Sequence, residues 1–173
     1  ELFRNTPFMI QVFLLFYVLP FYGIRIPANI VGIIGLALFG SVYYAEIIRA
    51  GIDAIPRGQL ESARSIGMSH WQSMTNIVLP QTMRIILPPI GNQTLSLVKE
   101  SSILSTITVQ ELTMSALIVQ GQTFRPFEVF IVITLLYWGV NELIATGLRI
   151  YERRLKRQSR LVLAGTLSNE KAS

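Results

Sequence analysis

The chain has 173 residues, of which 51% are hydrophobic and 14% are charged, with a net charge of +5 and no cysteine. The charged share is about half that of typical soluble domains, which argues against a soluble globular protein. Without cysteine the chain forms no disulfide and offers no thiolate, and its lone histidine, His70, suggests no zinc site. It contains no G-x-x-x-x-G-K-[ST] loop for ATP. We therefore predict no catalytic residue, no metal and no cofactor in this chain.

Four hydrophobic segments predict an all-α membrane protein whose helices form a bundle, with spans at about 6–24, 27–48, 76–98 and 126–148. Two runs without a charged residue, Asn5–Ile24 and Ile26–Ala45, are each 20 residues long, enough to cross the hydrocarbon core as a helix. The third and fourth segments have shorter uncharged runs, so each must carry a charge near one end. The alternative, buried helices of a soluble protein, would usually give much shorter segments.

The second segment contains three small residues, Gly32, Gly35 and Gly40. Lipid provides no hydrophobic drive between helices, and small residues help them associate because they let two backbones approach closely. We therefore expect a packing helix, either inside the bundle or at a dimer interface. At its end, Glu46 and Arg49 lie three residues apart and can pair on one helix face.

A polar loop separates the second and third segments. Pro56 and Gly58 break the chain, residues 59–66 predict about two helical turns, and Gly67 is suited to end them as a C-terminal cap. We expect a second short helix over residues 68–75. The most distinctive residues follow the pattern E-S-A, three residues, G, nine residues, I-x-L-P, and they are Glu61, Ser62, Ala63, Gly67, Ile77, Leu79 and Pro80.

This pattern resembles the cytoplasmic EAA loop of ABC importer permeases, with Ser62 in place of the usual alanine. In that family the loop is a coupling helix that lodges in a cleft of the ATPase subunit. The segment RNTPFMIQ, from Arg4 to Gln11, resembles the R-G-T-P-x-x-x-Q segment of permeases for polar amino acids, of the histidine, glutamine, glutamate and arginine type. Residues 43–63 resemble the same branch.

The resemblance covers residues 1–155 as one transmembrane domain and implies a multi-pass protein of the bacterial inner membrane. It also implies the partners: ABC ATPase subunits that hydrolyse ATP, a second permease subunit, alike or different, and an external amino-acid-binding protein. This chain itself is then not an enzyme. Permeases of this family generally have at least five spans, so one further span is expected upstream of Glu1.

Polar residues gather near the end of the third segment, which also contains Pro80, Pro88 and Pro89. Each proline removes a backbone donor and tends to kink a helix, and broken membrane helices often line a pathway. A zwitterionic amino acid needs both charge signs, which Lys99 and Glu100 can supply; alternatively, these two residues only mark the outer end of the span. The polar side chains are costly in lipid. The predicted substrate pathway comprises Asn92, Gln93, Ser96, Lys99, Glu100 and Ser101.

Basic residues are in excess on the cytoplasmic side of membrane proteins. Here they concentrate after the last segment, between Arg149 and Arg160, and in the loop 49–75, so we expect this loop and the C-terminus inside the cell. Residues 156–173 are predicted to be a flexible basic tail that contacts lipid headgroups, and no nucleic acid partner is expected. Residues 103–125 are expected to form an amphipathic helix at the outer surface.

Two other classes of membrane protein remain as alternatives. An ion-coupled secondary transporter has no need of the loop and would place more carboxylates within the membrane than this chain does. A non-transporting membrane anchor subunit would not explain the polar, proline-containing third segment.

Overall fold

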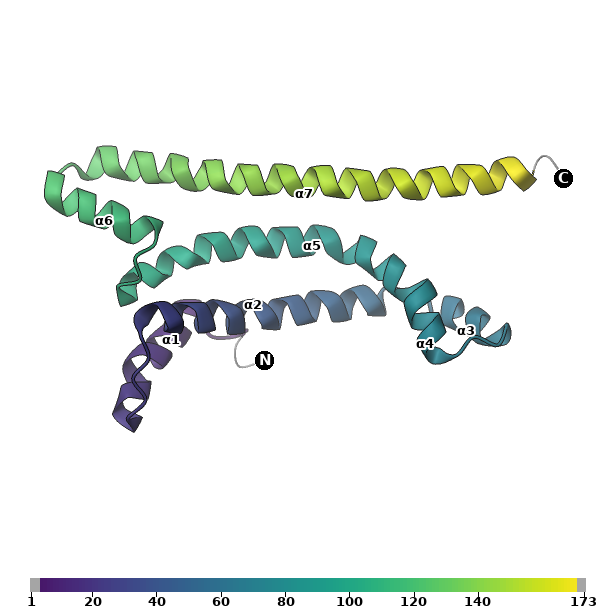
Figure 1. Cartoon of the computed structure of the whole chain (residues 1–173), viewed down its shortest axis with the longest axis horizontal. Coiled ribbons are helices and arrows are strands. Elements are labelled where there is room, and N and C mark those ends of the chain that lie inside the picture. Colours follow the sequence, from purple (N-terminus) through teal and green to yellow (C-terminus); the bar gives the residue numbers. More distant parts are fainter. Residues whose placement is uncertain (1–3, 171–173) are drawn as a thin grey trace. The chain divides into compact units, whose positions relative to one another are not determined.

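The computed structural model describes residues 4–170, with side chains for residues 4–153, and every regular element in this part of the chain is helical. The predicted all-α fold is therefore confirmed. The chain divides into two compact units, Glu1–Ala45 with Asn92–Leu143 and Glu46–Gly91 with Ile144–Ser173. The α-helices of the described part (Figure 1) are α1 Phe8–Phe13, α2 Ala28–Asp53, α3 Arg57–Ser65, α4 His70–Ser73, α5 Leu79–Glu100, α6 Leu112–Thr123 and α7 Pro126–Glu170.

The first hydrophobic segment is a short and irregular helix. α1 continues through a π-helical turn, Leu14–Val18, into a 3₁₀ turn, Leu19–Tyr22. The π turn ends two residues before Pro20, whose ring and missing N–H disturb the regular α-helical bonds. The apolar helix Phe8–Tyr22 is shorter than a membrane crossing requires. The described helix is thus shorter than the segment predicted as a span at 6–24, and that span stays a prediction.

The core of the first unit forms where α1, α2 and the 3₁₀ segment after α5 meet. A Cβ added at Gly35 would lie 3.2 Å from Val12 Cγ2, and one added at Gly40 would lie 3.0 Å from Leu97 Cδ1. Gly35 and Gly40 of α2 therefore pack against other segments of the same chain. Of the two predicted roles for this helix, packing inside the bundle is the one that these contacts support. The buried core residues are Phe8, Val12, Val31, Phe39, Leu104 and Ile107.

α5 runs without interruption through Pro88 and Pro89. The expected break at these prolines is therefore absent, since membrane helices tolerate proline where neighbouring groups compensate for the lost bonds. A 3₁₀ segment, Ser101–Ile107, continues from α5, and the chain bends by 50° between His70–Ile107 and Leu112–Thr123. The third segment thus bends after its polar stretch rather than before it.

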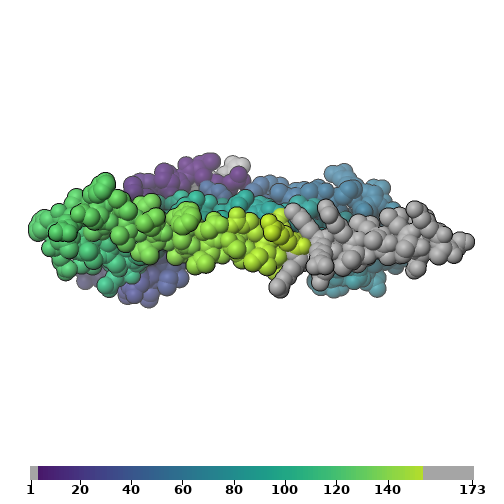
Figure 2. Space-filling view, turned by 90° about the horizontal axis from the view of Figure 1, so that it is seen from above, coloured from purple at the N-terminus to yellow at the C-terminus, as the bar shows by residue number. Residues whose placement is uncertain are grey.

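Two described helices, α2 and Pro126–Arg153 of α7, are long and apolar enough to cross a membrane. The two helical segments that meet at the 50° bend, His70–Ile107 and Leu112–Thr123, make a third if they are counted as one span. The count of four spans stays a prediction. Large apolar side chains of α7, among them Phe127, Trp138 and Leu143, are exposed, and the green part of α7 lies on the face shown in Figure 2. Such a surface suits contact with lipid or with another chain.

α7 continues to Glu170, past the predicted end of the last span at 148 and past the start of the predicted tail at 156. The flexibility of residues 156–173 stays a prediction, and residues 171–173 lie outside the described part of the chain.

Candidate functional site

The polar loop folds into α3, a tight turn at Gly67 and α4 (Figure 1). The Gly67 N–H donates to the Arg64 carbonyl at 3.0 Å, and the Met68 N–H donates to the Ala63 carbonyl at 3.1 Å. This pair of bonds satisfies the last carbonyls of α3 and needs a residue in the left-handed conformation between them. Gly67 supplies it with φ of 82°, so the predicted C-terminal cap is confirmed.

A capping box starts the second half of the loop. The Ser69 N–H donates to Gln72 Oε1 at 2.9 Å, and the Gln72 N–H donates to Ser69 Oγ at 3.3 Å. α4 consequently starts at His70, whereas the second short helix was predicted to start at residue 68. The S-x-x-Q spacing in the sequence would have indicated the start at His70. α4 then passes through a second π turn, Met74–Val78, directly into α5, with no flexible linker between them.

One side-chain amide connects α3 to the start of α5. Gln81 Nε2 donates to the Ile77 carbonyl at 2.9 Å and to Gln59 Oε1 at 3.2 Å. Ile77 is half-buried beside the fully buried Val78, whereas Leu79 and Pro80 are exposed. The I-x-L-P residues do not belong to α3; they form the junction between α4 and α5.

The remaining loop residues divide by exposure. Ala63 is buried, at 2% exposure, whereas Glu61 and Ser62 are exposed on α3. One exposed apolar residue lies on each side of the turn: Ile66, 78% exposed, before it and Trp71, 75% exposed, after it. Tryptophan is enriched among the residues that dominate binding at interfaces. The sequence pattern did not single out Ile66 or Trp71, and their exposure could not be read from the sequence, because the loop also contains other large apolar residues such as Leu60 and Met68.

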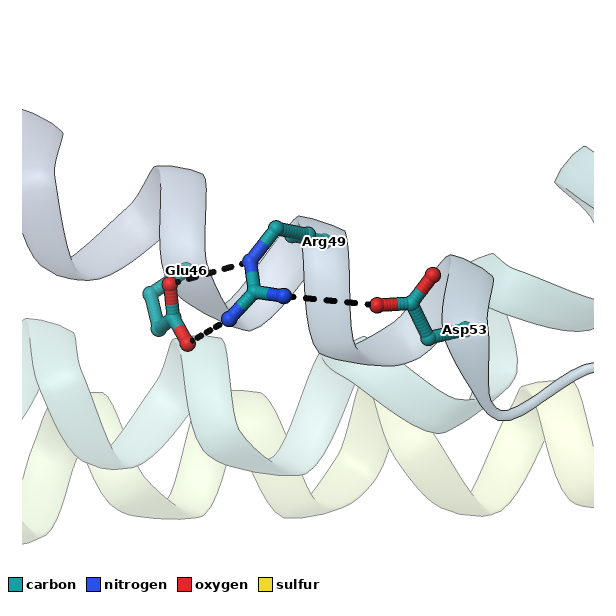
Figure 3. Close-up of polar contacts among 3 residues, drawn as sticks. All are labelled: Glu46, Arg49 and Asp53. Carbon is teal, nitrogen blue, oxygen red and sulfur yellow. Dashed lines mark hydrogen bonds and ion pairs between the residues drawn. The ribbon is translucent and has the colours of Figure 1, made fainter.

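Arg49 connects two carboxylates at the end of α2 (Figure 3). Its Nε donates to Glu46 Oε2 at 3.2 Å, its Nη2 contacts Glu46 Oε1, and its Nη1 lies 3.5 Å from Asp53 Oδ2. The predicted Glu46–Arg49 pair is confirmed and extends to Asp53. Exposed pairs of this kind contribute little free energy. Among the described side chains, no group of three or more His, Cys, Asp or Glu residues is arranged to hold a metal ion.

The polar residues of α5 fall on two adjoining faces. At about 100° per residue, Asn92, Ser96 and Lys99 share one face, and Gln93 and Glu100 share the next. Asn92 and Lys99 are exposed, whereas Gln93, Ser96 and Glu100 are half-buried. The two neighbouring charges of the predicted zwitterion site therefore point in different directions.

Ser101 lies beyond α5, in the 3₁₀ segment, and its hydroxyl donates to the Val98 carbonyl at 2.7 Å. This bond satisfies the hydroxyl within its own helix, which makes the side chain less costly in an apolar environment.

The packing of α2 against the last part of α5 sets the depth of Glu100. A Cβ at Gly40 would lie 3.0 Å from Leu97 Cδ1, and a Cβ at Gly32 would lie 3.0 Å from Leu104 Cδ1. Residues 97–104 therefore run beside residues 32–40 of α2, a helix long and apolar enough to cross a membrane. This register places Glu100 beside α2; a role of Glu100 in the substrate pathway and the alternative that it marks the outer end of a span both stay predictions.

Glu100 lines a pocket of about 390 Å³ between the start of the described chain, α2 and the end of α5. Lys99 is not among the described residues that line it. Arg4 lines the same pocket, so the two charged residues that line it come from segments far apart in the sequence. The other lining residues are Asn5, Thr6, Pro7, Phe8, Met9, Phe39, Tyr43 and Ile103.

Gln11 explains the spacing of the RNTPFMIQ segment. Its side chain is 7% exposed, and its Nε2 donates to the Thr6 carbonyl at 3.1 Å and to Thr6 Oγ1 at 3.0 Å. A buried amide with two bonds to one residue fixes the backbone that leads into α1. Gln11 was not among the predicted site residues.

The expected amphipathic helix at 103–125 is replaced by the end of the 3₁₀ segment, a short connection and α6. Glu111 caps α6 with both carboxylate oxygens, which accept from the N–H groups of Met114 at 2.7 Å and Thr113 at 2.8 Å. The Tyr137 hydroxyl of α7 donates to Glu111 Oε2 at 3.0 Å and lies 2.9 Å from Thr113 Oγ1. This network connects α6 to α7.

Residues 1–157 match the family described as binding-protein-dependent transport system inner membrane component. A probable amino-acid ABC transporter permease protein of Bacillus subtilis, YckA, is 38% identical over 151 residues, which cover 87% of this chain and 67% of the relative. The probable glutamine ABC transporter permease protein GlnM of the same organism is 38% identical, with 91% and 73% covered. Its L-cystine transport system permease protein TcyB is 33% identical, with 89% and 66% covered.

A solved structure shares the fold. The chain superposes with a TM-score of 0.84 and 42% sequence identity on a chain of a structure described as an amino acid ABC transporter with histidines. The match covers 89% of this chain and 72% of that one.

Proposed function

The chain belongs to the family of inner membrane components of binding-protein-dependent transport systems, and we propose that it is the permease subunit of an ABC importer for polar amino acids. The loop geometry carries this proposal, because α3, Gly67 and α4 form an ordered, exposed unit joined to α5 without a flexible linker. The relatives named for glutamine and L-cystine support amino acids as the substrate class. They favour neither a secondary transporter nor a membrane anchor.

The partners follow from the family. ATP hydrolysis takes place on separate ABC ATPase subunits, a second permease subunit completes the pathway, and an external binding protein delivers the amino acid. The residues in contact with the ATPase are Glu61 and Ser62 on α3, together with Ile66 and Trp71 beside the turn, because all four are exposed. Ala63 packs on the buried face of α3. Ile77, Leu79 and Pro80 transmit the displacement of α3 and α4 to α5.

The two adjoining polar faces of α5, with Ser101 just beyond its end, form the substrate pathway, which comprises Asn92, Gln93, Ser96, Lys99, Glu100 and Ser101. Polar and charged groups beside a spanning helix are costly in lipid and are therefore placed there for function by default. In this arrangement closure of the ATPases moves α3, and the rigid junction at residues 77–81 carries that movement into the helix that lines the pathway.

Gly67→Ala tests the coupling role. Alanine in the left-handed conformation costs about 1–2 kcal/mol, so the turn between α3 and α4 should open or shift. We expect ATP-dependent amino acid uptake in proteoliposomes containing the assembled importer to fall by roughly tenfold. Gly23→Ala is the matched control, because Gly23 has φ of 79° and, like Gly67, no described neighbour within 4 Å of its added Cβ.

The control variant should keep uptake close to that of the unmodified importer, although it carries the same local strain. Equal losses in the two variants, or no loss in either, would contradict a coupling role for the loop. Co-purification of the ATPase with each variant shows whether the defect lies in docking or in the transmission of movement after docking.

A further inference from the structure

We propose that the groove between α6 and the start of α7 binds a membrane phospholipid whose headgroup carries a phosphate and a primary ammonium, as in phosphatidylethanolamine. One acyl chain lies in the groove, Arg125 holds the phosphate, and Glu128 holds the ammonium group. This inference goes beyond the transport function and does not depend on it, because the groove contains none of the residues of the predicted substrate pathway.

The groove is an apolar hollow of about 320 Å³ between two helices that belong to the same compact unit (Figure 1). The small side chains of Ser115 and Ala116 leave room on the α6 side, and the buried Ile133 lies on the α7 side. The Ser115 hydroxyl donates to the Glu111 carbonyl at 2.9 Å, so its polarity is satisfied within α6. Apart from Ser115 and Glu128, every described residue that lines the groove is apolar.

The two helices are connected at both ends of the groove. At one end, the Tyr137 hydroxyl donates to Glu111 Oε2 at 3.0 Å and lies 2.9 Å from Thr113 Oγ1. At the other end, only Phe124 and Arg125 separate α6 from α7. The groove is therefore formed before a ligand enters, which lowers the entropy cost of binding.

The length of the groove fits one leaflet of a bilayer. The part of α7 that begins at Pro126 is long and apolar enough to cross a membrane, and the groove follows it from Glu128 to Leu136. Eight residues at 1.5 Å each correspond to about 12 Å. Half of the hydrocarbon core measures about 15 Å, and acyl chains are the apolar groups that surround a spanning helix. An acyl chain of one leaflet therefore fits the groove, with its headgroup at the start of α7.

The start of α7 supplies the two charges of complementary sign. Arg125 continues the helix face of Val129 and Val132, and its carbonyl accepts from the Val129 N–H at 3.2 Å. Glu128 lines the groove itself. Both side chains are exposed, and neither has a hydrogen bond or ion pair with another described side chain.

The chemistry of these two side chains selects among headgroups. A guanidinium binds a phosphate through parallel hydrogen bonds, and a carboxylate accepts hydrogen bonds from an ammonium group. The quaternary ammonium of phosphatidylcholine has no N–H to donate, and the glycerol headgroup of phosphatidylglycerol has no cation. Both of these lipids therefore satisfy Arg125 only, whereas phosphatidylethanolamine satisfies Arg125 and Glu128 together.

The test uses phospholipids with a photoactivatable diazirine on the acyl chain. The assembled importer is placed in nanodiscs of constant background lipid that contain phosphatidylethanolamine, phosphatidylcholine or phosphatidylglycerol carrying the same diazirine chain. Labelled residues are identified by mass spectrometry. The variants are Arg125→Gln, Glu128→Gln and Val132→Phe. The controls are Arg25→Gln, at an exposed arginine outside the groove, and Val140→Phe, because both valines are exposed on α7 and only Val132 lines the groove.

We expect phosphatidylethanolamine to label the groove residues of the unmodified protein about threefold more than the other two lipids do. Glu128→Gln should abolish this preference, and Arg125→Gln should lower labelling by all three lipids by about threefold to fivefold. Val132→Phe should lower labelling by all three because it fills the groove. The two controls should leave labelling unchanged. Labelling is expressed relative to that of α2 in the same sample, so the amount of protein in the sample cancels.

Equal labelling by the three lipids in the unmodified protein would overturn the inference, since it would show unselective contact with bulk lipid. Absence of labelling would overturn it as well, because a protein segment would then cover the groove. A preference that survives Glu128→Gln, or an equal loss in Val132→Phe and Val140→Phe, would also contradict it. Labelling requires neither ATP nor a transported amino acid, so a failure of the proposed function would leave this result readable.

Discussion

At the scale of single residues, Gly51 has the closest contact of the described glycines. A Cβ added there would lie 2.1 Å from Ile86 Cγ2 and 3.3 Å from Thr82 Cγ2, and both neighbours are buried. Ile86 is β-branched, so its Cγ2 cannot easily turn away. We expect Gly51→Ala to lower the stability of the purified protein by about 1–3 kcal/mol, measured by thermal unfolding in detergent.

The cause of that loss can be isolated with a double variant. Ile86→Ala removes the clashing methyl group and costs about 2–5 kcal/mol by itself, so Gly51→Ala with Ile86→Ala should be less destabilised than the sum of the two single changes. Gly121→Ala is the control, because it has no described neighbour within 4 Å and should be neutral or stabilising by about 0.5–1 kcal/mol. Strict additivity would show that the α2–α5 contact is not the cause.

At the scale of elements, α6 depends on one carboxylate for its start. Glu111→Ala leaves the N–H groups of Thr113 and Met114 without their acceptor, which should cost about 0.5–2 kcal/mol. We expect faster amide hydrogen exchange across α6, measured by mass spectrometry. Tyr137→Phe should have a smaller effect, because it removes only the contact from α7 and leaves the cap intact.

Thr134→Val is the control for these two changes, since the Thr134 hydroxyl donates to the Phe130 carbonyl within α7 and does not reach α6. Exchange in α6 that is unchanged by Glu111→Ala would mean that packing, and not the cap, holds the helix start.

The elements also show what a sequence can predict. The cap at Gly67, the Glu46–Arg49 pair and the packing role of the α2 glycines depend on neighbours within the helix or on residue size, and all three were predictable. The position of Glu100 beside α2 was not predictable, because it depends on the register of α5 against α2. That register is set by tertiary contacts between residues far apart in the sequence.

At the scale of the whole molecule, the distribution of basic residues predicts which parts of the chain face the cytoplasm. From Arg57 and Arg64 in the polar loop, and Arg149 and Arg153 after the last predicted span, we predict that the loop and the C-terminus face the inside of the cell. The same reasoning predicts α6 near the outer surface. The docking of an ATPase at α3 requires this orientation, because ATP is available on the cytoplasmic side.

The absence of cysteine from the sequence makes the orientation directly measurable. Ser65 in α3 and Gln122 in α6 are exposed, so Ser65→Cys and Gln122→Cys each introduce one accessible thiol. A membrane-impermeant maleimide should label Gln122→Cys in intact cells and Ser65→Cys only after the cells are permeabilised. Labelling of both denatured proteins checks that each thiol is reactive. Labelling of Ser65→Cys in intact cells would show that the orientation is the reverse of the predicted one, and a cytoplasmic ATPase could then not reach the loop.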